Sequence, residues 1–144
     1  MKEKICTFCG HKLVADNDTE DRVYSALSTL IKTENYNAFY SGGMGEFDEI
    51  CENAIRKLKR EHPHIKLYRV IYKYKPNLDA IKELVDDIIL PELEGFHYKE
   101  MILKRNEWMI DSSDAVLCYI RRDFGGAYKT MKHAEKSGKM IINL

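Results

Sequence analysis

This 144-residue sequence carries no net charge, because 23 lysines and arginines balance 23 aspartates and glutamates. Without a positive excess, long-range attraction to nucleic acid or to an acidic membrane surface is not expected. Long apolar runs are also missing: none approaches the roughly 20 residues that cross a bilayer. The N-terminal region lacks the apolar core of a signal peptide. We therefore expect a cytoplasmic protein without a membrane or nucleic-acid partner.

A second close cysteine pair is missing as well. Cys6 and Cys9 form a Cys-x-x-Cys, but a closed zinc site takes four ligands, usually from two such pairs. Cys51 and Cys118 are far apart, and each lies within an apolar pattern. The sequence therefore favours buried thiols and no metal site, with a metal or redox use of Cys6 and Cys9 as the alternative.

Short apolar runs alternate with amphipathic segments along the chain. Strands are expected at residues 4–9, 38–41, 66–72, 115–120 and 140–144. Helices are expected where apolar residues recur at helical spacing, at residues 23–31, 47–58, 78–89, 98–109 and 125–136. This alternation predicts one α/β domain over residues 1–144, with a mostly parallel sheet of about five strands and helices on both faces.

Two glycine-rich turns each follow an expected strand and precede a helix. The first is Ser-Gly-Gly-Met-Gly at 41–45, and the second is Gly-Gly at 125–126. In a parallel sheet, such turns meet at the carboxyl ends of strands, where backbone N–H groups and a helix N-terminus bind anions. Neither turn matches G-x-G-x-x-G or a Walker A loop, so a tight turn without a ligand is the alternative. The candidate ligand-binding residues are Gly10, His11, Ser41, Gly42, Gly43, Gly45, Gly125 and Gly126.

Three carboxylates begin the helix after the first turn: Glu46, Asp48 and Glu49. Acidic residues at that place stabilise the positive end of a helix. A carboxylate that points into the pocket is instead a candidate catalytic acid or base. Because these groups oppose a charged phosphate, a ribose hydroxyl or an amine is their expected contact.

Arg105 lies on the apolar stripe of its expected helix, since apolar residues flank it three and four positions away on both sides. An arginine that points inward is costly unless it has a partner. That partner is either a ligand phosphate or an internal carboxylate, Asp111 or Asp114. The neighbouring Asn106 either contacts a polar edge of the same ligand or lies at the surface.

Three segments together resemble a known family. They are Phe-Cys-Gly-His-Lys at 8–12, Ser-Gly-Gly-Met-Gly-Glu-Phe-Asp at 41–48, and the run from Arg105 to Asp114. In this order they resemble the YpsA-like proteins of the SLOG superfamily, named for Smf/DprA and LOG proteins. The resemblance covers nearly the whole chain and implies a three-layer Rossmann-like fold with a pocket for a nucleotide derivative at the strand ends. Some relatives hydrolyse nucleoside monophosphates, others sense nucleotide signals, and one branch binds single-stranded DNA.

The second glycine turn departs from the motif that the phosphoribohydrolases of this superfamily carry. Their Pro-Gly-Gly-x-Gly-Thr-x-x-Glu becomes Phe-Gly-Gly-Ala-Tyr-Lys-Thr-Met-Lys, with Tyr128, Lys129 and Lys132 in place of glycine, threonine and glutamate. A carboxylate that the resemblance implies for the reaction is therefore missing. We predict a sensor or regulatory module that binds a nucleotide or nucleotide-derived ligand.

Two other functions are kept as hypotheses. One is a hydrolase that cleaves an N-glycosidic bond of a nucleoside monophosphate, using one of the three carboxylates of 46–49 in place of the missing one. The other is a DNA-handling module. No cofactor is firmly implied. Relatives often dimerise, and the tyrosines that could serve a homodimer interface or complete the core are Tyr68, Tyr72, Tyr74 and Tyr98.

Overall fold

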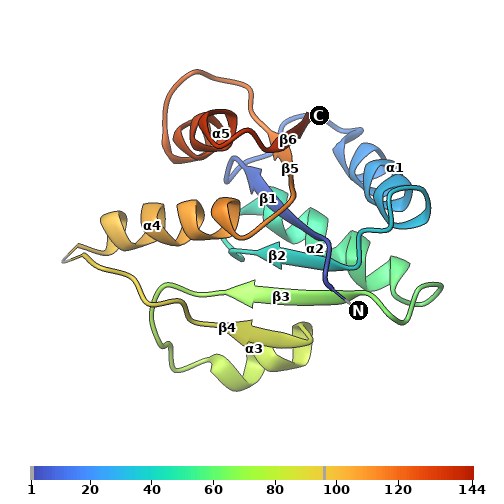
Figure 1. Ribbon diagram of the computed structural model, residues 1–144, viewed down its shortest axis with the longest axis horizontal. Coiled ribbons are helices and arrows are strands. Elements are labelled where there is room, and N and C mark those ends of the chain that lie inside the picture. The colour runs from blue at the N-terminus through green and yellow to red at the C-terminus, as the bar shows by residue number, and fades with distance from the viewer. Residues whose placement is uncertain (1, 96) are drawn as a thin grey trace.

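Six parallel strands form the central sheet of the computed structural model, which describes residues 2–95 and 97–144. The strands are β1 (Ile5–Gly10), β2 (Ala38–Ser41), β3 (Lys66–Val70), β4 (Asp87–Ile89), β5 (Ala115–Tyr119) and β6 (Met140–Asn143). The helices are α1 (Thr19–Lys32), α2 (Glu46–Leu58), α3 (Leu78–Leu84), α4 (Tyr98–Asp111) and α5 (Gly126–Lys136). Their arrangement around the sheet is shown in Figure 1.

Helices cover both faces of the sheet, and alternate residues of a strand pack against opposite layers. On β5, Leu117 belongs to the core beneath α1 and α2, whereas Val116 and Cys118 pack with residues of α4 and α5. A strand buried on both faces needs apolar residues at every position. This is why residues 115–120 show no polar alternation. The predicted α/β class, with a parallel sheet and helices on both faces, is confirmed.

The strand order β4-β3-β2-β1-β5-β6 places the chain reversal between β1 and β5. From β1 the chain adds β2, β3 and β4 on one side, and it then returns to add β5 and β6 on the other (Figure 1). In a sheet of this kind, the crevice at the carboxyl ends of the two central strands is the usual ligand site. The segments after β1, β2 and β5 all reach this edge, as the sequence predicted.

The helix predicted at 78–89 is wrong in its second half. α3 ends at Leu84, and residues 87–89 form β4, which pairs with β3 at the sheet edge. Asp86 directs this pairing, because its N–H donates to the Leu67 carbonyl and its carboxylate accepts the Leu67 N–H, both at 2.8 Å. The apolar spacing of this segment fits a helix equally well, and only pairing with a distant strand decides the outcome. The sheet therefore has one strand more than the sequence predicted.

All four cysteines are buried free thiols. Cys6 lies in the core beneath α1 and α2, and burial raises its pKa to about 12. Cys9 lies on the opposite face, where its Sγ donates to the Ala127 carbonyl oxygen at 3.1 Å. The two cysteines of the Cys-x-x-Cys thus face opposite layers, which prevents them from holding one metal ion together.

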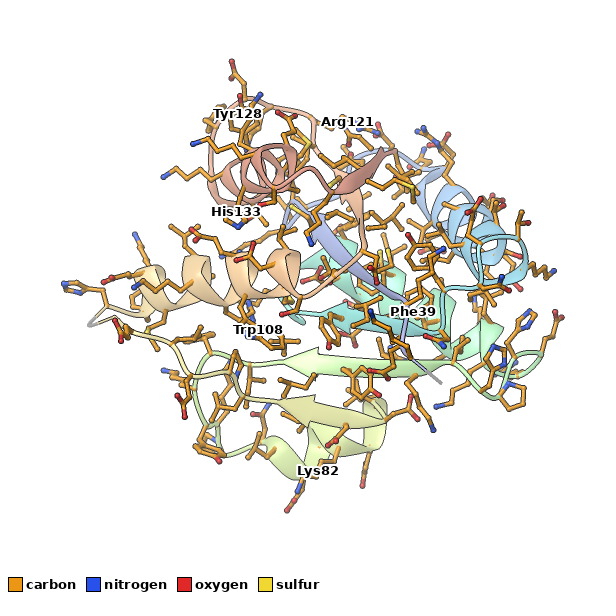
Figure 2. The ribbon with its side chains drawn as sticks, in the orientation of Figure 1. Phe39, Lys82, Trp108, Arg121, Tyr128 and His133 are labelled. Atoms are coloured by element: carbon orange, nitrogen blue, oxygen red, sulfur yellow. The ribbon has the colours of Figure 1, made fainter. Side chains whose placement is uncertain are left out.

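Of the four tyrosines considered for an interface, Tyr68 is partly buried and contacts Tyr40 edge to face, with ring centroids 5.7 Å apart. Trp108, which extends from α4 beside the sheet in Figure 2, stacks on the same Tyr40 ring. Tyr74 and Tyr98 are exposed. Among the described residues, no helix combines the length and the apolar character that crossing a membrane requires.

Candidate functional site

A cleft of about 780 Å³ opens at the carboxyl ends of β1 and β5. Residues 8–13 line it from the end of β1, and Tyr119, Arg121 and Arg122 line it from the end of β5. α2, α4 and α5 supply the other walls. Of the predicted ligand-binding residues, those that line the cleft are Gly10, His11, Arg105, Asn106 and Gly126. Those that do not are Ser41, Gly42, Gly43, Gly45 and Gly125.

The first glycine turn covers an internal ion pair. The buried Ser41 hydroxyl donates to Glu52 Oε2 at 2.6 Å and accepts the Gly43 N–H at 3.1 Å. Glu52 also accepts two hydrogen bonds from Arg69, at 2.9 and 2.7 Å. A Cβ on Gly43 would stand 2.5 Å from the Arg69 guanidinium carbon, at a φ of +64° that disfavours any side chain. Glycine is therefore needed here for internal packing.

Two further donors of the first turn also have partners within the chain. The Met44 N–H donates to Asp48 Oδ2 at 2.9 Å, and the Glu46 N–H donates to the Lys12 carbonyl at 2.8 Å. Asp48 thus occupies the place that a ligand anion would take at the N-terminus of α2. This geometry does not favour the predicted role of the first turn in binding phosphate.

Arg105 is buried on α4 and clamps the ends of two strands. Its Nη1 donates to the carbonyl oxygens of Gly42 at 3.2 Å and Val70 at 3.0 Å. Its Nη2 contacts Met44 Sδ at 3.1 Å, and its Nε donates to Asn106 Oδ1 at 2.9 Å. Burial lowers the pKa of Arg105, while the nearby carboxylate of α2 opposes this shift. Helical spacing identified this arginine as inward-facing, and backbone carbonyls supply its acceptors.

The first alternative for Arg105, a pair with an internal carboxylate such as Asp111 or Asp114, is not what the structure has, because both carboxylates bond elsewhere. Asp111 Oδ1 lies 2.8 Å from His133 Nε2 on α5. Asp114 Oδ2 accepts the Ile5 N–H at 2.9 Å, at the opposite end of the sheet. The other alternative, a contact of Arg105 with a ligand phosphate, stays a hypothesis.

Only one of the three candidate carboxylates of α2 turns into the cleft. Asp48 lines it and is 8% exposed. Burial raises its pKa to about 7, although the Met44 N–H and the charge of Arg105 favour the ionised form. Glu46 is exposed and accepts the Val14 N–H at 3.0 Å, and Glu49 is exposed. As a candidate acid or base, Asp48 is the member of this set with the right position.

His11 connects the ends of β1 and β5. The ring is 6% exposed, and its Nε2 accepts the Arg121 N–H at 2.9 Å. Neutral imidazole then carries its proton on Nδ1, a buried atom without a hydrogen-bond partner among the described residues. Burial lowers the pKa of His11, and the charges of Arg122 and Arg121 lower it further. The cleft wall thus includes a neutral histidine with an unused donor.

The second glycine turn is open where the first is filled. Gly125 precedes α5 with a φ of +92°, and a Cβ on Gly126 would meet no atom within 4 Å. The first three N–H groups of α5, at residues 126–128, have no hydrogen-bond partner among residues 2–95 and 97–144. No acidic residue lies in the first turn of α5. These bare donors and the positive helix end form the anion-binding geometry of this edge.

Two arginines follow β5 next to this open turn. Arg121 lies over the Tyr119 ring at 4.2 Å and pairs with Asp16 at 2.9 Å; Figure 2 shows it between α5 and α1. Arg122 lies over the Phe124 ring at 4.9 Å and has no ion pair within the described part of the chain. Among the residues that replace the phosphoribohydrolase motif, Lys132 is exposed and pairs with Glu135 at 3.1 Å.

Comparison with known proteins gives one distant sequence relative. No protein-family model matches the chain. The uncharacterized SPbeta prophage-derived protein YoqJ of Bacillus subtilis (strain 168) is 24% identical over 138 residues, covering 82% of this chain and 81% of the relative. An identity this low shows a likeness and assigns no function.

Solved structures give a closer likeness in three dimensions. DNA processing protein A (DprA) from Streptococcus pneumoniae superposes with a TM-score of 0.69 at 14% identity, over 98% of this chain and 50% of that one. DprA from Helicobacter pylori, described for its single-stranded DNA binding mode, gives 0.69 at 19% identity over 97% and 64%. The molybdenum cofactor binding protein of Rippkaea orientalis gives 0.66 at 22% identity over 99% and 77%.

These neighbours establish the fold. At identities of 14–22% these structures show the fold alone, and the chain shares their Rossmann-like architecture. The chain spans half of one DprA and 64% of the other. Because one neighbour binds single-stranded DNA, the comparisons do not support the expectation that nucleic acid is absent from the partners.

Proposed function

We propose that this protein binds a nucleotide or nucleotide-derived small molecule in the cleft between β1 and β5, as a sensor or regulatory module of the YpsA-like type. The observation that carries the proposal is the open second turn. The first N–H groups of α5 and the Arg122 guanidinium, which have no hydrogen-bond or ion-pair partner among residues 2–95 and 97–144, lie together with the positive end of α5 at one end of the cleft. Such a combination suits a phosphate.

The rest of the cleft suits the remainder of such a ligand. Its volume of about 780 Å³ lies within the range of small-molecule sites. Phe8, Ile102 and Met109 supply apolar walls, and Asp48 and Asn106 add a few polar groups. The base of a nucleotide has flat apolar faces and polar edges, so it matches a cleft with apolar walls and a few polar groups.

The phosphate-binding role is tested at Gly126, where a side chain has room. Gly126→Asp adds a negative charge beside the bare N–H groups, and an acidic residue at a helix start does not disturb folding. We expect it to weaken binding of AMP or GMP by at least about tenfold, because charge-assisted hydrogen bonds are lost. Gly126→Ala is the matched control and retains the affinity. Isothermal titration calorimetry measures both.

Two results would contradict nucleotide binding in the cleft. If the wild-type protein binds neither nucleotide at millimolar concentration, and native mass spectrometry of gently purified protein finds no bound small molecule, the proposal fails. Tight, salt-sensitive binding of single-stranded DNA in place of nucleotides would support the DNA-handling hypothesis. Gly43→Asp is a poor test, since Gly43 is needed for packing against Arg69.

A hydrolase is the second candidate, because Asp48 is a cleft-lining acid whose pKa is raised to about 7. A carboxyl group that titrates near neutrality suits proton transfer. Release of free base from a nucleoside monophosphate, abolished in Asp48→Asn, would establish it. Intact nucleotide recovered after prolonged incubation would count against it.

A further inference from the structure

Three cations surround the ring of Tyr72, which follows β3 at the carboxyl edge of the sheet. Lys73 Nζ lies 5.6 Å from the ring centroid, Lys75 Nζ lies 5.1 Å from it, and the Arg105 guanidinium carbon lies 5.8 Å from it. None of these cations forms an ion pair among residues 2–95 and 97–144. We call these four residues the Tyr72 cluster. Like charges that gather without a counter-ion repel one another and attract an anion.

The buried Arg105 distinguishes the Tyr72 cluster from a group of solvated surface lysines. Its side chain is 2% exposed, and a buried charge without an ionic partner is costly. Its hydrogen bonds go to neutral acceptors: two backbone carbonyls, the Met44 thioether and the Asn106 amide oxygen. Asp48 favours its charged form electrostatically, without an ion pair. The charge of Arg105 is therefore only partly compensated within the described residues.

The segment after β3 supplies the remaining groups of this place. It reads Tyr-Lys-Tyr-Lys at 72–75, and the Tyr74 ring is 75% exposed. Alternating basic and aromatic side chains suit a sugar-phosphate backbone and bases that stack. The residues of this segment do not line the cleft, whereas Arg105 lines it and also lies near the Tyr72 ring. The Tyr72 cluster therefore adjoins the cleft across Arg105.

The Tyr72 cluster and the open second turn lie far apart along the ligand edge. The second turn follows β5 and the Tyr72 cluster follows β3, with β1 and β2 between these strands (Figure 1). Neighbouring strands are about 4.8 Å apart, so three spacings separate the two places by roughly 14 Å. Two phosphates on one ribose lie closer together than this. A ligand with phosphates at both places is therefore longer than a mononucleotide.

We propose that the Tyr72 cluster binds a second phosphate of the ligand, which makes the ligand a dinucleotide with phosphates at both ends. This rests on the proposed function and adds the size and charge of the ligand to it. The second phosphate accepts charge-assisted hydrogen bonds from Lys73 and Lys75, beside the positive charge of Arg105. One base fills the apolar part of the cleft, and the other stacks on the exposed Tyr74 ring.

Isothermal titration calorimetry with AMP and with pApAp, an adenine dinucleotide that carries phosphates at both ends, tests the second phosphate site. We expect the wild-type protein to bind pApAp at least about tenfold more tightly than AMP. In Lys73→Ala/Lys75→Ala this advantage is lost and AMP affinity is retained, because neither lysine lines the cleft. Retained AMP binding also shows that the variant is folded.

A matched control separates the site from the overall charge of the protein. Lys57→Ala/Lys136→Ala removes two exposed lysines of α2 and α5 and changes the net charge equally. We expect this control to keep the advantage of pApAp over AMP. Salt dependence is a second readout: the slope of log affinity for pApAp against log salt concentration falls by about one for each lysine removed from the Tyr72 cluster. The control leaves this slope unchanged.

Failure of this inference is distinguishable from failure of the proposed function. Equal affinity for AMP and pApAp, or an advantage that survives in Lys73→Ala/Lys75→Ala, overturns the second phosphate site even if Gly126→Asp still weakens AMP binding. An equal loss in the control assigns the advantage to overall charge and also overturns the site. Tighter binding of oligo(dT) than of pApAp overturns the dinucleotide and supports the DNA-handling hypothesis. If the wild-type protein binds neither AMP, pApAp nor inorganic phosphate, both proposals fall.

Discussion

The two glycine turns occupy equivalent positions in the sheet, but the first is filled by side chains of the protein and the second is open. Each follows a central strand and begins a helix at a glycine with positive φ, Gly45 at +102° and Gly125 at +92°. Three donors of the first turn, the N–H groups of Gly43, Met44 and Glu46, bond to a serine, an aspartate and a backbone carbonyl. The first three N–H groups of α5 have no partner among the described residues. The same local motif therefore builds either a closed structural joint or an open anion site. Side chains supplied from elsewhere in the chain decide between them.

The largest expected effect comes from removing the ion pair beneath the first turn. Glu52→Ala leaves Arg69 without its carboxylate partner in a largely buried position. We expect the free energy of unfolding to fall by about 3–5 kcal/mol, the usual cost of breaking a buried pair. Urea unfolding measures it, with the exposed Glu49→Ala as a control that changes stability little. A loss below about 1 kcal/mol would mean that the first turn does not depend on this pair.

The second effect comes from Asp48, the buried carboxyl group that accepts the Met44 N–H in the first turn. Burial raises the pKa of Asp48 to about 7, so the folded protein binds a proton that the unfolded chain releases near pH 4. Its contribution to stability is therefore present at low pH and is lost as pH rises toward 7. Relative to Asp48→Asn, wild type should lose on the order of 3 kcal/mol between pH 4 and pH 7. A pH-independent difference between the two proteins would contradict this.

The smallest effects compare the two turns directly. Gly43→Ala forces a side chain into a positive φ and against Arg69, and we expect it to cost about 1–3 kcal/mol. Gly126→Ala meets open space at a helix start, and we expect a change of less than about 1 kcal/mol, in the stabilising direction. Thermal melting of the pair at one pH measures both. Equal losses would remove the distinction between a packed and an open turn.

Local signals made much of this fold predictable. Uninterrupted apolar runs marked the buried parallel strands, and glycine turns marked the ligand edge. β4 was missed because its apolar residues, with those just before them, fit helical spacing as well as a strand. Pairing with β3 is a contact between distant segments, which periodicity does not report.

The candidate site was predicted only in part, because several of its contacts also join segments that are distant in the sequence. Helical spacing placed Arg105 on the inner face of α4, but its acceptors are carbonyls 63 and 35 residues away. Glu52 and Arg69, which fill the first turn, were not identified. Glu52 lies four residues after Asp48 on the buried face of α2, a spacing that could have revealed it. Arg69 could not have been found in this way, since it reaches the turn from another strand.

Arg105 on α4 connects the cleft to the ends of two strands outside it. Arg105 lines the cleft while its guanidinium holds the ends of β2 and β3. Its five donors are fixed in one planar fork, so an occupant that draws the guanidinium toward itself competes with those two carbonyl oxygens. Such an occupant would weaken the hold of Arg105 on the ends of β2 and β3, and faster amide hydrogen exchange there would report it.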